Sequence, residues 1–209
     1  MNKIFIIIAI FISANLYSQP SDEQPKLNDP DELVSDSKDN LFVLMKYGIA
    51  KITPDGKVID LRKQEGGAAI DKDFKNLIID SKDNLFVSDG NNIYKITVTD
   101  ENKVISNIYA GFSGKYRIID GPIATAAFAE IHRMAMDKND NIYLTDSYDN
   151  IAKEGHLDGK ALLALFSYPK GLAYDSKGNL FISDSWNNCI RKLSPDGMVS
   201  SITAPLPNN

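Results

Sequence analysis

The sequence DSKDNLFV occurs twice, at residues 36–43 and again at 80–87, and looser copies follow as DKNDNIYL at 137–144 and DSKGNLFI at 175–182. The copies begin 44, 57 and 38 residues apart. A sequence that recurs at such intervals encodes one small structural unit several times, and neighbouring units bury each other's apolar faces. The repeat therefore predicts an architecture built from four similar units.

Each copy has the pattern of a β-hairpin. An apolar stretch ends at the first Asp, and an Asn four residues later begins a second apolar stretch. Two strands joined by a short polar turn form a hairpin. The residue before the Asn is Asp39, Asp83, Asp140 or Gly178, and these residue types tolerate a positive φ angle. We therefore expect a left-handed backbone conformation at this position of each turn.

Two further strands complete each unit. A third strand is expected at 93–96 in the second copy and at 190–193 in the fourth, where alternation places basic residues, including Arg191, on the solvent face. A Ser-Pro-Asp-Gly turn at 194–197 leads to a fourth strand. Four antiparallel strands form one propeller blade. The predicted fold is all-β, a β-propeller of four four-stranded blades. It is either a closed four-bladed ring or a partial propeller. The blades are expected near 32–62, 74–110, 131–165 and 169–203.

The fourth copy resembles a known repeat family. The run YPKGLAYDSKGNLFISDSWNNCIRKLSPDG, residues 168–197, is similar to an NHL repeat, and the segment 109–146 resembles the longer linker between such repeats. The resemblance covers roughly residues 33–203 and is weaker in the first copy, where Met45 replaces an Asp. It implies a propeller related to gluconolactonase-type proteins. Propellers of this family commonly have six blades, so four copies leave closure of the ring open.

The N-terminus predicts export. The apolar run IFIIIAIFI at 4–12, preceded by Lys3, is typical of a secretory signal peptide, here residues 1–18. Residues 19–31 contain three Pro and no apolar period, which predicts a flexible tether. The propeller is expected over 32–204, with a tail at 205–209. The mature protein is therefore expected to be secreted, periplasmic or on the cell surface, and free of the membrane.

Charge and cysteine content exclude other classes. With 23 basic and 28 acidic residues the net charge is −5 at pH 7, which disfavours nucleic-acid binding because that requires clustered Lys and Arg. Cys189 is the only cysteine, so no internal disulfide can form. We expect it to be a small, half-buried core residue.

No catalytic motif is evident. The only two His, His132 and His156, lack the spacing of a zinc site. Residues 111–115 lack the second Gly of a serine-hydrolase elbow, and 155–161 end in Ala where a phosphate loop has a hydroxyl residue. The sequence therefore favours a protein without catalytic activity, but it does not decide whether the protein is an enzyme.

A second Asp recurs five residues after the turn Asn in three copies, as Asp89, Asp146 and Asp184. Each carboxylate is expected to accept hydrogen bonds from the turn that follows its strand. The alternative is a ring of carboxylates around a divalent cation such as calcium, as the resemblance to gluconolactonase-type enzymes would imply. Recurrence in three copies favours the structural role, because a metal needs one asymmetric ligand set; no cofactor is then expected.

The turns after these Asp residues differ most between copies, and variable loops on a rigid scaffold are where binding concentrates. The leading hypothesis is a non-catalytic recognition scaffold that binds a protein or carbohydrate through this loop face. The alternatives are a divalent-metal-dependent lactonase or hydrolase and a structural module of a homo-oligomer, whose apolar end faces would include Leu33 and Leu41 in copy one and Leu180 and Ile182 in copy four. The candidate ligand-binding residues are Trp186, Asn187, Asn188, Tyr148, Asn91, His132 and Arg133.

Overall fold

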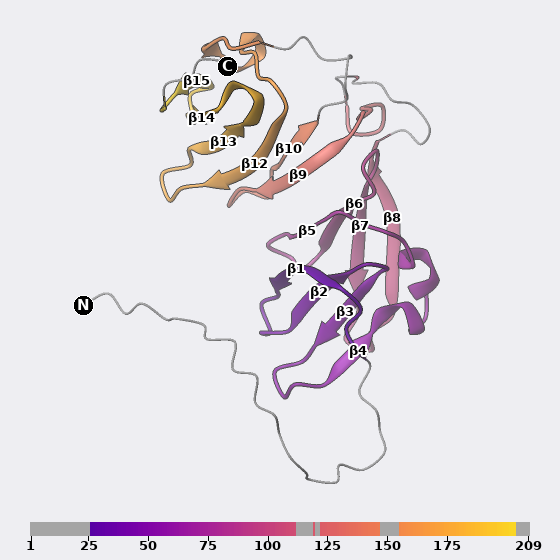
Figure 1. Cartoon of the computed structure of the whole chain (residues 1–209). Helices are drawn as coiled ribbons and strands as arrows, with labels where there is room; N and C mark the ends of the chain where they lie inside the picture. Colours follow the sequence, from indigo (N-terminus) through magenta and orange to yellow (C-terminus); the bar gives the residue numbers. More distant parts are fainter. Residues whose placement is uncertain (1–25, 112–118, 120–121, 147–154, 204–209) are drawn as a thin grey trace, which may run out of the picture.

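In the computed structural model the described residues are 26–111, 119, 122–146 and 155–203. The predicted signal peptide, Tyr148 and the predicted tail at 205–209 lie outside them. Figure 1 shows four groups of antiparallel strands that follow one another along an open arc, with the first and fourth groups at its two ends. The inner strands of successive groups contact each other, as they do in a propeller.

The first two blades have the four strands expected of them, paired in chain order. Two short 3₁₀ helices connect them, η1 (Leu61–Lys63) and η2 (Gly67–Ile70). The strands of the first blade are β1 (Pro30–Ser35), β2 (Leu41–Met45), β3 (Ile49–Ile52) and β4 (Val58–Asp60). Those of the second are β5 (Asn76–Ile79), β6 (Leu85–Ser88), β7 (Ile93–Val98) and β8 (Val104–Ala110).

The fourth blade has one strand more than expected. Its sheet has the order β11-β15-β14-β13-β12. The helices η3 (Ala161–Leu163) and η4 (Ser185–Asn187) lie beside it in the chain. The five strands are β11 (Gly159–Lys160), β12 (Pro169–Tyr174), β13 (Leu180–Asp184), β14 (Cys189–Leu193) and β15 (Met198–Ser201).

The third copy differs from the prediction. Its described residues form two strands, β9 (Ile131–Met136) and β10 (Ile142–Asp146). Residues 159–160, expected to complete this blade, instead pair with β15 of the fourth. The carboxylate of Asp158 explains the change of partner, because it accepts hydrogen bonds from the backbone N–H of Ser201 and from Arg191 in the fourth blade.

The turn of the repeat has the predicted conformation. The residue before the Asn has φ 61° at Asp39, 63° at Asp83, 64° at Asp140 and 83° at Gly178. The first Asp of each turn stabilises it: in the first copy one carboxylate oxygen of Asp36 accepts the N–H of residue 38 at 2.9 Å and of residue 40 at 2.8 Å. The other three copies repeat this arrangement. The recurring octapeptide therefore encodes a hairpin turn.

The apolar core lies between blades. One cluster joins the first two blades and includes Phe42, Leu77 and Leu85, and a second joins the second and third blades and includes Phe86 and Ile131. Cys189 is fully buried in the fourth blade, more than the half-burial that the sequence predicts. No helix in the described residues is both long and apolar enough to cross a membrane.

Candidate functional site

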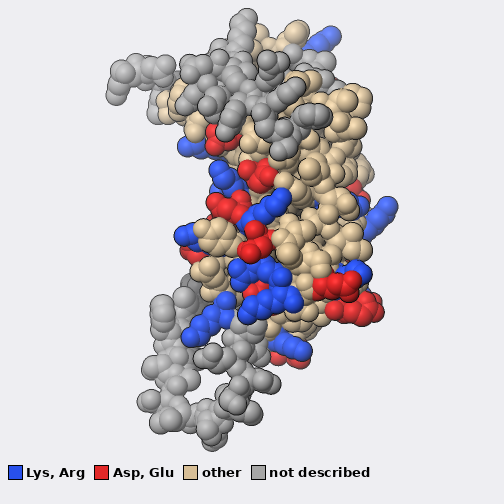
Figure 2. Space-filling view, turned by 90° about the vertical axis from the view of Figure 1, so that its right-hand side faces the viewer, with Lys and Arg blue, Asp and Glu red and all other residues tan. Residues whose placement is uncertain are grey.

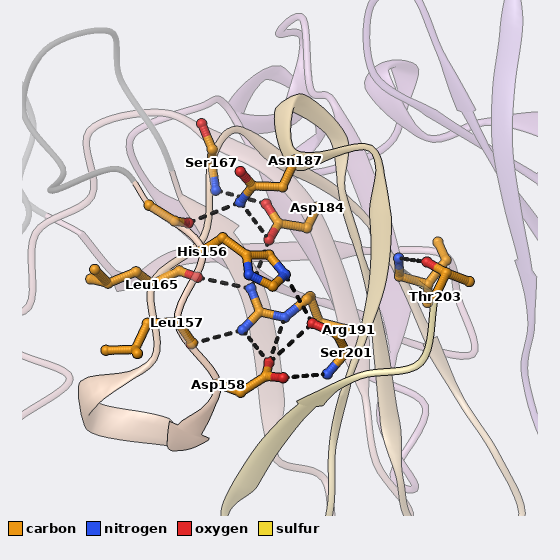
Figure 3. Close-up of polar contacts among 12 residues, drawn as sticks. His156, Leu157, Asp158, Leu165, Ser167, Asp184, Asn187, Arg191, Ser201 and Thr203 are labelled. Carbon is orange, nitrogen blue, oxygen red and sulfur yellow. Dashed lines mark hydrogen bonds and ion pairs between the residues drawn. The ribbon is translucent and has the colours of Figure 1, made fainter. Parts of the chain in front are cut away.

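A buried arginine organises the fourth blade (Figure 3). Arg191 on β14 is 0% exposed, so the expectation that it faces solvent is wrong. Its Nη1 donates to Asp184 Oδ2 and to the carbonyl of Leu165, each at 2.8 Å. Its Nη2 donates to the carbonyl of Leu157 at 2.8 Å and to Asp158 Oδ1 at 2.7 Å. The guanidinium, with five donors in a fixed fork, therefore holds the segment before the blade against the blade itself.

The recurring second Asp residues are occupied by protein donors. Asp89 accepts the N–H of Asn92 at 2.9 Å and the hydroxyl of Tyr94 at 2.7 Å. Asp184, itself 0% exposed, accepts the N–H of Ser167 at 2.7 Å besides Arg191. In the described residues no group of three or more His, Cys, Asp or Glu side chains is arranged to hold a metal ion.

Asp146 accepts hydrogen bonds from the linker before its blade, as Asp184 does from Ser167. Its carboxylate accepts the N–H groups of Ala129 at 3.0 Å and Glu130 at 2.7 Å. Burial raises the pKa of this carboxyl above its ordinary value, against the opposing effect of these hydrogen bonds. Asp146 also lines a cleft of about 600 Å³ between the second and third blades, together with Phe128 and Leu144.

A serine and a histidine meet at the edge of the fourth blade. Ser201 Oγ lies 2.9 Å from His156 Nε2, and it also donates to Asp158 Oδ1 at 3.1 Å. In a catalytic triad the carboxylate orients the imidazole through the second ring nitrogen. Here the carboxylate contacts the hydroxyl directly and is paired with Arg191. The geometry of these three groups is therefore not that of a catalytic triad.

Three aromatic rings from different elements form a cluster at the surface: His132 on β9, Tyr168 just before β12, and Trp186 in η4. The rings of Tyr168 and Trp186 stack with centroids 4.9 Å apart and planes 17° from parallel. The His132 ring lies 5.0 Å from that of Tyr168, and Lys170 Nζ lies 4.8 Å from the Tyr168 centroid. Trp186 is 51% exposed. We call His132, Tyr168 and Trp186 the aromatic cluster.

Strand register explains how the aromatic cluster assembles. Pro169 pairs with Asp184, so the residue before β12 lies beside η4, which carries Trp186. The inner strands β9 and β12 of neighbouring blades are in contact, and His132 lies on β9. Tyr168 has a φ of 51°, uncommon for a bulky side chain. The register therefore brings two of the predicted candidate residues, His132 and Trp186, into contact with Tyr168.

The remaining candidates have other contacts. Arg133 forms an ion pair with Glu32 of β1 at 3.2 Å. The side chain of Asn187 donates to the carbonyl of Gly155 at 2.9 Å, and that of Asn91 donates to the carbonyl of Ala129 at 2.6 Å. Both amides thus anchor linkers to turns. Asn188 is exposed and ends η4 with a φ of 51°.

The sequence pattern does not single out Tyr168 or Lys170 as site residues. The signal for Tyr168 is its place just before β12, because β12 pairs with β13 and the turn that carries Trp186 follows β13. Figure 2, turned by 90° from the view of Figure 1, shows a face on which basic and acidic side chains are interspersed across the middle. Such a mixed face does not form the basic stripe typical of nucleic-acid binding.

Comparisons with known proteins agree with this architecture. A family model described as the NHL repeat matches residues 166–193. A protein of unknown function from Bacteroides thetaiotaomicron has a similar structure, with 20% identity, 79% of this chain and 47% of that chain covered, and a TM-score of 0.63. No curated protein matches the chain.

Two further solved structures share the fold. An auxiliary nutrient binding protein from Bacteroides thetaiotaomicron has 12% identity, with 84% of this chain and 47% of that chain covered and a TM-score of 0.57. Virginiamycin B lyase from Staphylococcus aureus has 16% identity, with 86% and 57% covered and a TM-score of 0.54. The chain thus spans about half the length of each of these three structures. It carries an NHL repeat at residues 166–193, in the fourth blade of a β-propeller fold, as the resemblance in its sequence predicts.

Proposed function

We propose that this protein is a non-catalytic recognition module outside the cytoplasm, and that the aromatic cluster binds a carbohydrate. The observation that carries the proposal is the half-exposed Trp186 ring, which has one face stacked on Tyr168 and lies among polar residues. Because Tyr168 supports one face, the opposite face of the indole is held in a fixed orientation. A rigid aromatic surface loses little conformational freedom on binding.

The surroundings of Trp186 suit a small ligand with both apolar and hydroxyl groups. Lys170 is exposed beside Tyr168, and Asn188 is exposed two residues after Trp186. A sugar ring has an apolar face that can lie on an indole and hydroxyls at its rim that can bond to such side chains. A protein partner needs roughly 800 Å² on each side with an apolar centre, and the polar residues around this single Trp do not provide that centre.

Two further considerations support the proposal. The predicted signal peptide over residues 1–18 would deliver the protein to a compartment where glycans and nutrients are met. Structures of similar fold include one described as an auxiliary nutrient binding protein and one described as the extracellular domain of a putative one component system.

The test compares two exposed aromatic residues. Trp186→Ala removes the binding surface, whereas Tyr47→Ala removes a ring that is 45% exposed on the first blade, outside the cluster. Binding of the wild-type protein is first located on an array of oligosaccharides and then measured by calorimetry. We expect Trp186→Ala to weaken binding at least tenfold while Tyr47→Ala leaves it unchanged.

Stability measurements separate binding from folding. Tyr47→Ala should leave the free energy of unfolding within about 0.5 kcal/mol of wild type. Trp186→Ala should cost about 0.5–1.5 kcal/mol, because it removes the stack on Tyr168. Phe86→Ala, at a core position only 4% exposed, should cost about 3–5 kcal/mol. Undiminished glycan binding by Trp186→Ala would refute the proposed site. If no glycan binds and a protein partner is instead lost on Trp186→Ala, the ligand class is wrong.

A further inference from the structure

The repeat encodes a contact between blades as well as a turn. In the first junction Ser37, the second residue of its DSKDN turn, donates its N–H and hydroxyl to the two carboxylate oxygens of Asp83, at 2.9 and 2.6 Å. In the second junction Ser81 contacts Asp140 in the same way, at 2.9 and 2.7 Å. The donor is always the second residue of one turn and the acceptor the fourth residue of the next. We call this the Ser–Asp contact.

The third junction lacks the Ser–Asp contact because Lys138 and Gly178 occupy the two positions. There the rings of Tyr143 and Tyr174 meet with centroids 5.3 Å apart. The two ends of the arc retain one half of the contact each. Asp39 is an acceptor on the outer side of the first blade, and Ser176 is a donor on the outer side of the fourth. Neither side chain has a hydrogen-bond partner in the part of the chain that the structure describes.

The apolar residues at the junctions between blades also recur at fixed positions of the repeat. Phe42 and Phe86, two residues after the turn Asn, are buried to 3% and 4% exposure in clusters shared with the following blade. Phe181 is the equivalent residue of the fourth blade and is only partly buried. The end face of that blade therefore carries Phe181. Leu180 and Ile182, expected on it from the sequence, instead line a gap of about 300 Å³ shared with Leu144 and Thr145 of β10.

The first blade has the complementary face. Leu77 and Leu85 of the second blade belong to the same cluster as Phe42. These two residues lie three positions before and five positions after the first Asp of their turn. The equivalent residues of the first blade are Leu33 and Leu41, which are 65% and 37% exposed. The first blade thus offers an exposed version of a surface that is buried at the first internal junction.

We propose that the fourth blade of one chain docks on the first blade of a second copy, in the geometry of the first two internal junctions. Ser176 of one copy then donates to Asp39 of the other, and Phe181 packs on Leu33 and Leu41. Both halves of the contact are present on one chain, so two copies related by a two-fold axis form it twice and close a ring.

The test measures the mass in solution of the full chain purified after export. Sedimentation equilibrium should give twice the chain mass for the wild type at micromolar concentration. Phe181→Asp and Leu33→Asp should each weaken association at least a hundredfold, with an unchanged circular dichroism spectrum. Ile105→Asp is the matched control, because Ile105 is 46% exposed on the outer strand β8 and away from both ends. It should leave the dimer intact.

Disulfide trapping identifies the contact itself. The double variant Ser176→Cys/Asp39→Cys should form a disulfide-linked dimer under oxidising conditions, while Ser37→Cys/Asp83→Cys, at the internal junction, should close within one chain. Cys189 is buried and should not compete. A wild-type monomer at high concentration, a dimer that survives Phe181→Asp, or an intrachain bond between positions 39 and 176 would each overturn the proposal. Because glycan binding is measured separately, failure of either proposal leaves the other standing.

Discussion

Replacement of Arg191 by Met is the sharpest test of the network in the fourth blade. Met preserves the unbranched stem but removes the guanidinium. Asp184, 0% exposed, then keeps hydrogen-bond donors from Ser167 and Asn187 but has no cation beside it. Breaking a buried ion pair on one side typically costs about 3–5 kcal/mol, because the remaining charge is left uncompensated.

Other losses are smaller. The carbonyls of Leu157 and Leu165 lose a hydrogen bond each, worth about 1 kcal/mol when no water replaces it. Both residues lie in a segment that is not fully buried, so water can reach the carbonyls. The uncompensated carboxylate therefore dominates, and we expect Arg191→Met to lower the free energy of unfolding by about 3–5 kcal/mol.

Urea denaturation at pH 7 measures the effect, with Arg133→Met as control. Arg133 also pairs with a carboxylate, but its side chain is 50% exposed, so its loss should cost under about 1 kcal/mol. The double variant Arg191→Met/Asp184→Asn removes both charges and should be more stable than Arg191→Met alone. If Arg191→Met costs no more than the control, or if the second substitution adds further destabilisation, the reasoning about the buried charge is wrong.

Two further predictions concern the turns and the pH dependence of stability. Gly66→Ala should lower the free energy of unfolding by at least about 2 kcal/mol more than Gly56→Ala in urea denaturation. Both residues have a positive φ, but an added Cβ at Gly66 would lie 2.0 Å from the Val104 carbonyl oxygen, while a Cβ at Gly56 would have nothing within 4 Å. Equal costs would contradict the close approach. The hydrogen bonds from Ser81 lower the pKa of Asp140, so this carboxylate stabilises the fold above the unfolded value of about 3.9 and the stabilisation is lost as pH falls through the lower folded value. Asp140→Asn should therefore show a shallower loss of stability than wild type in denaturation series between pH 5 and pH 2, and identical slopes would refute an ionised contact.

What the sequence predicts well here is local. The turn conformation at Asp39, Asp83 and Asp140 follows from residue type within five positions, and each stabilising bond spans at most four residues. The blade order follows from the repeat for the same reason. What the sequence does not predict is long-range: Arg191 is buried because its partners Leu157 and Asp158 come from 34 and 33 residues away. An alternating pattern assigns a face of the sheet but does not reveal what covers that face.

The aromatic cluster is an intermediate case. Trp186 is identifiable from the sequence as the single Trp of the chain, in a variable turn, and the structure places it at the surface, 51% exposed. Its contact with Tyr168 depends on the pairing of Pro169 with Asp184, which includes a register irregularity between Pro169 and Leu172. A regular alternation counted along the strand does not anticipate that shift. The local pattern therefore identifies two residues of the cluster, Trp186 and His132, but not Tyr168, whose ring contacts both.

Because β11 pairs with β15, the sequence repeat and the folded fourth blade have different boundaries. The repeat recurs as a block that begins near the inner strand, yet the outermost strand of the fourth blade comes from chain that precedes this block. A fragment containing only residues 166–203 would expose the edge of β15 and leave Arg191 without the carbonyls of Leu157 and Leu165. During synthesis, β11 within residues 155–165 can pair with β15 only after β15 has been synthesised. A graft or truncation designed on repeat boundaries would cut through a folding unit, and boundaries drawn before residue 155 would keep it whole.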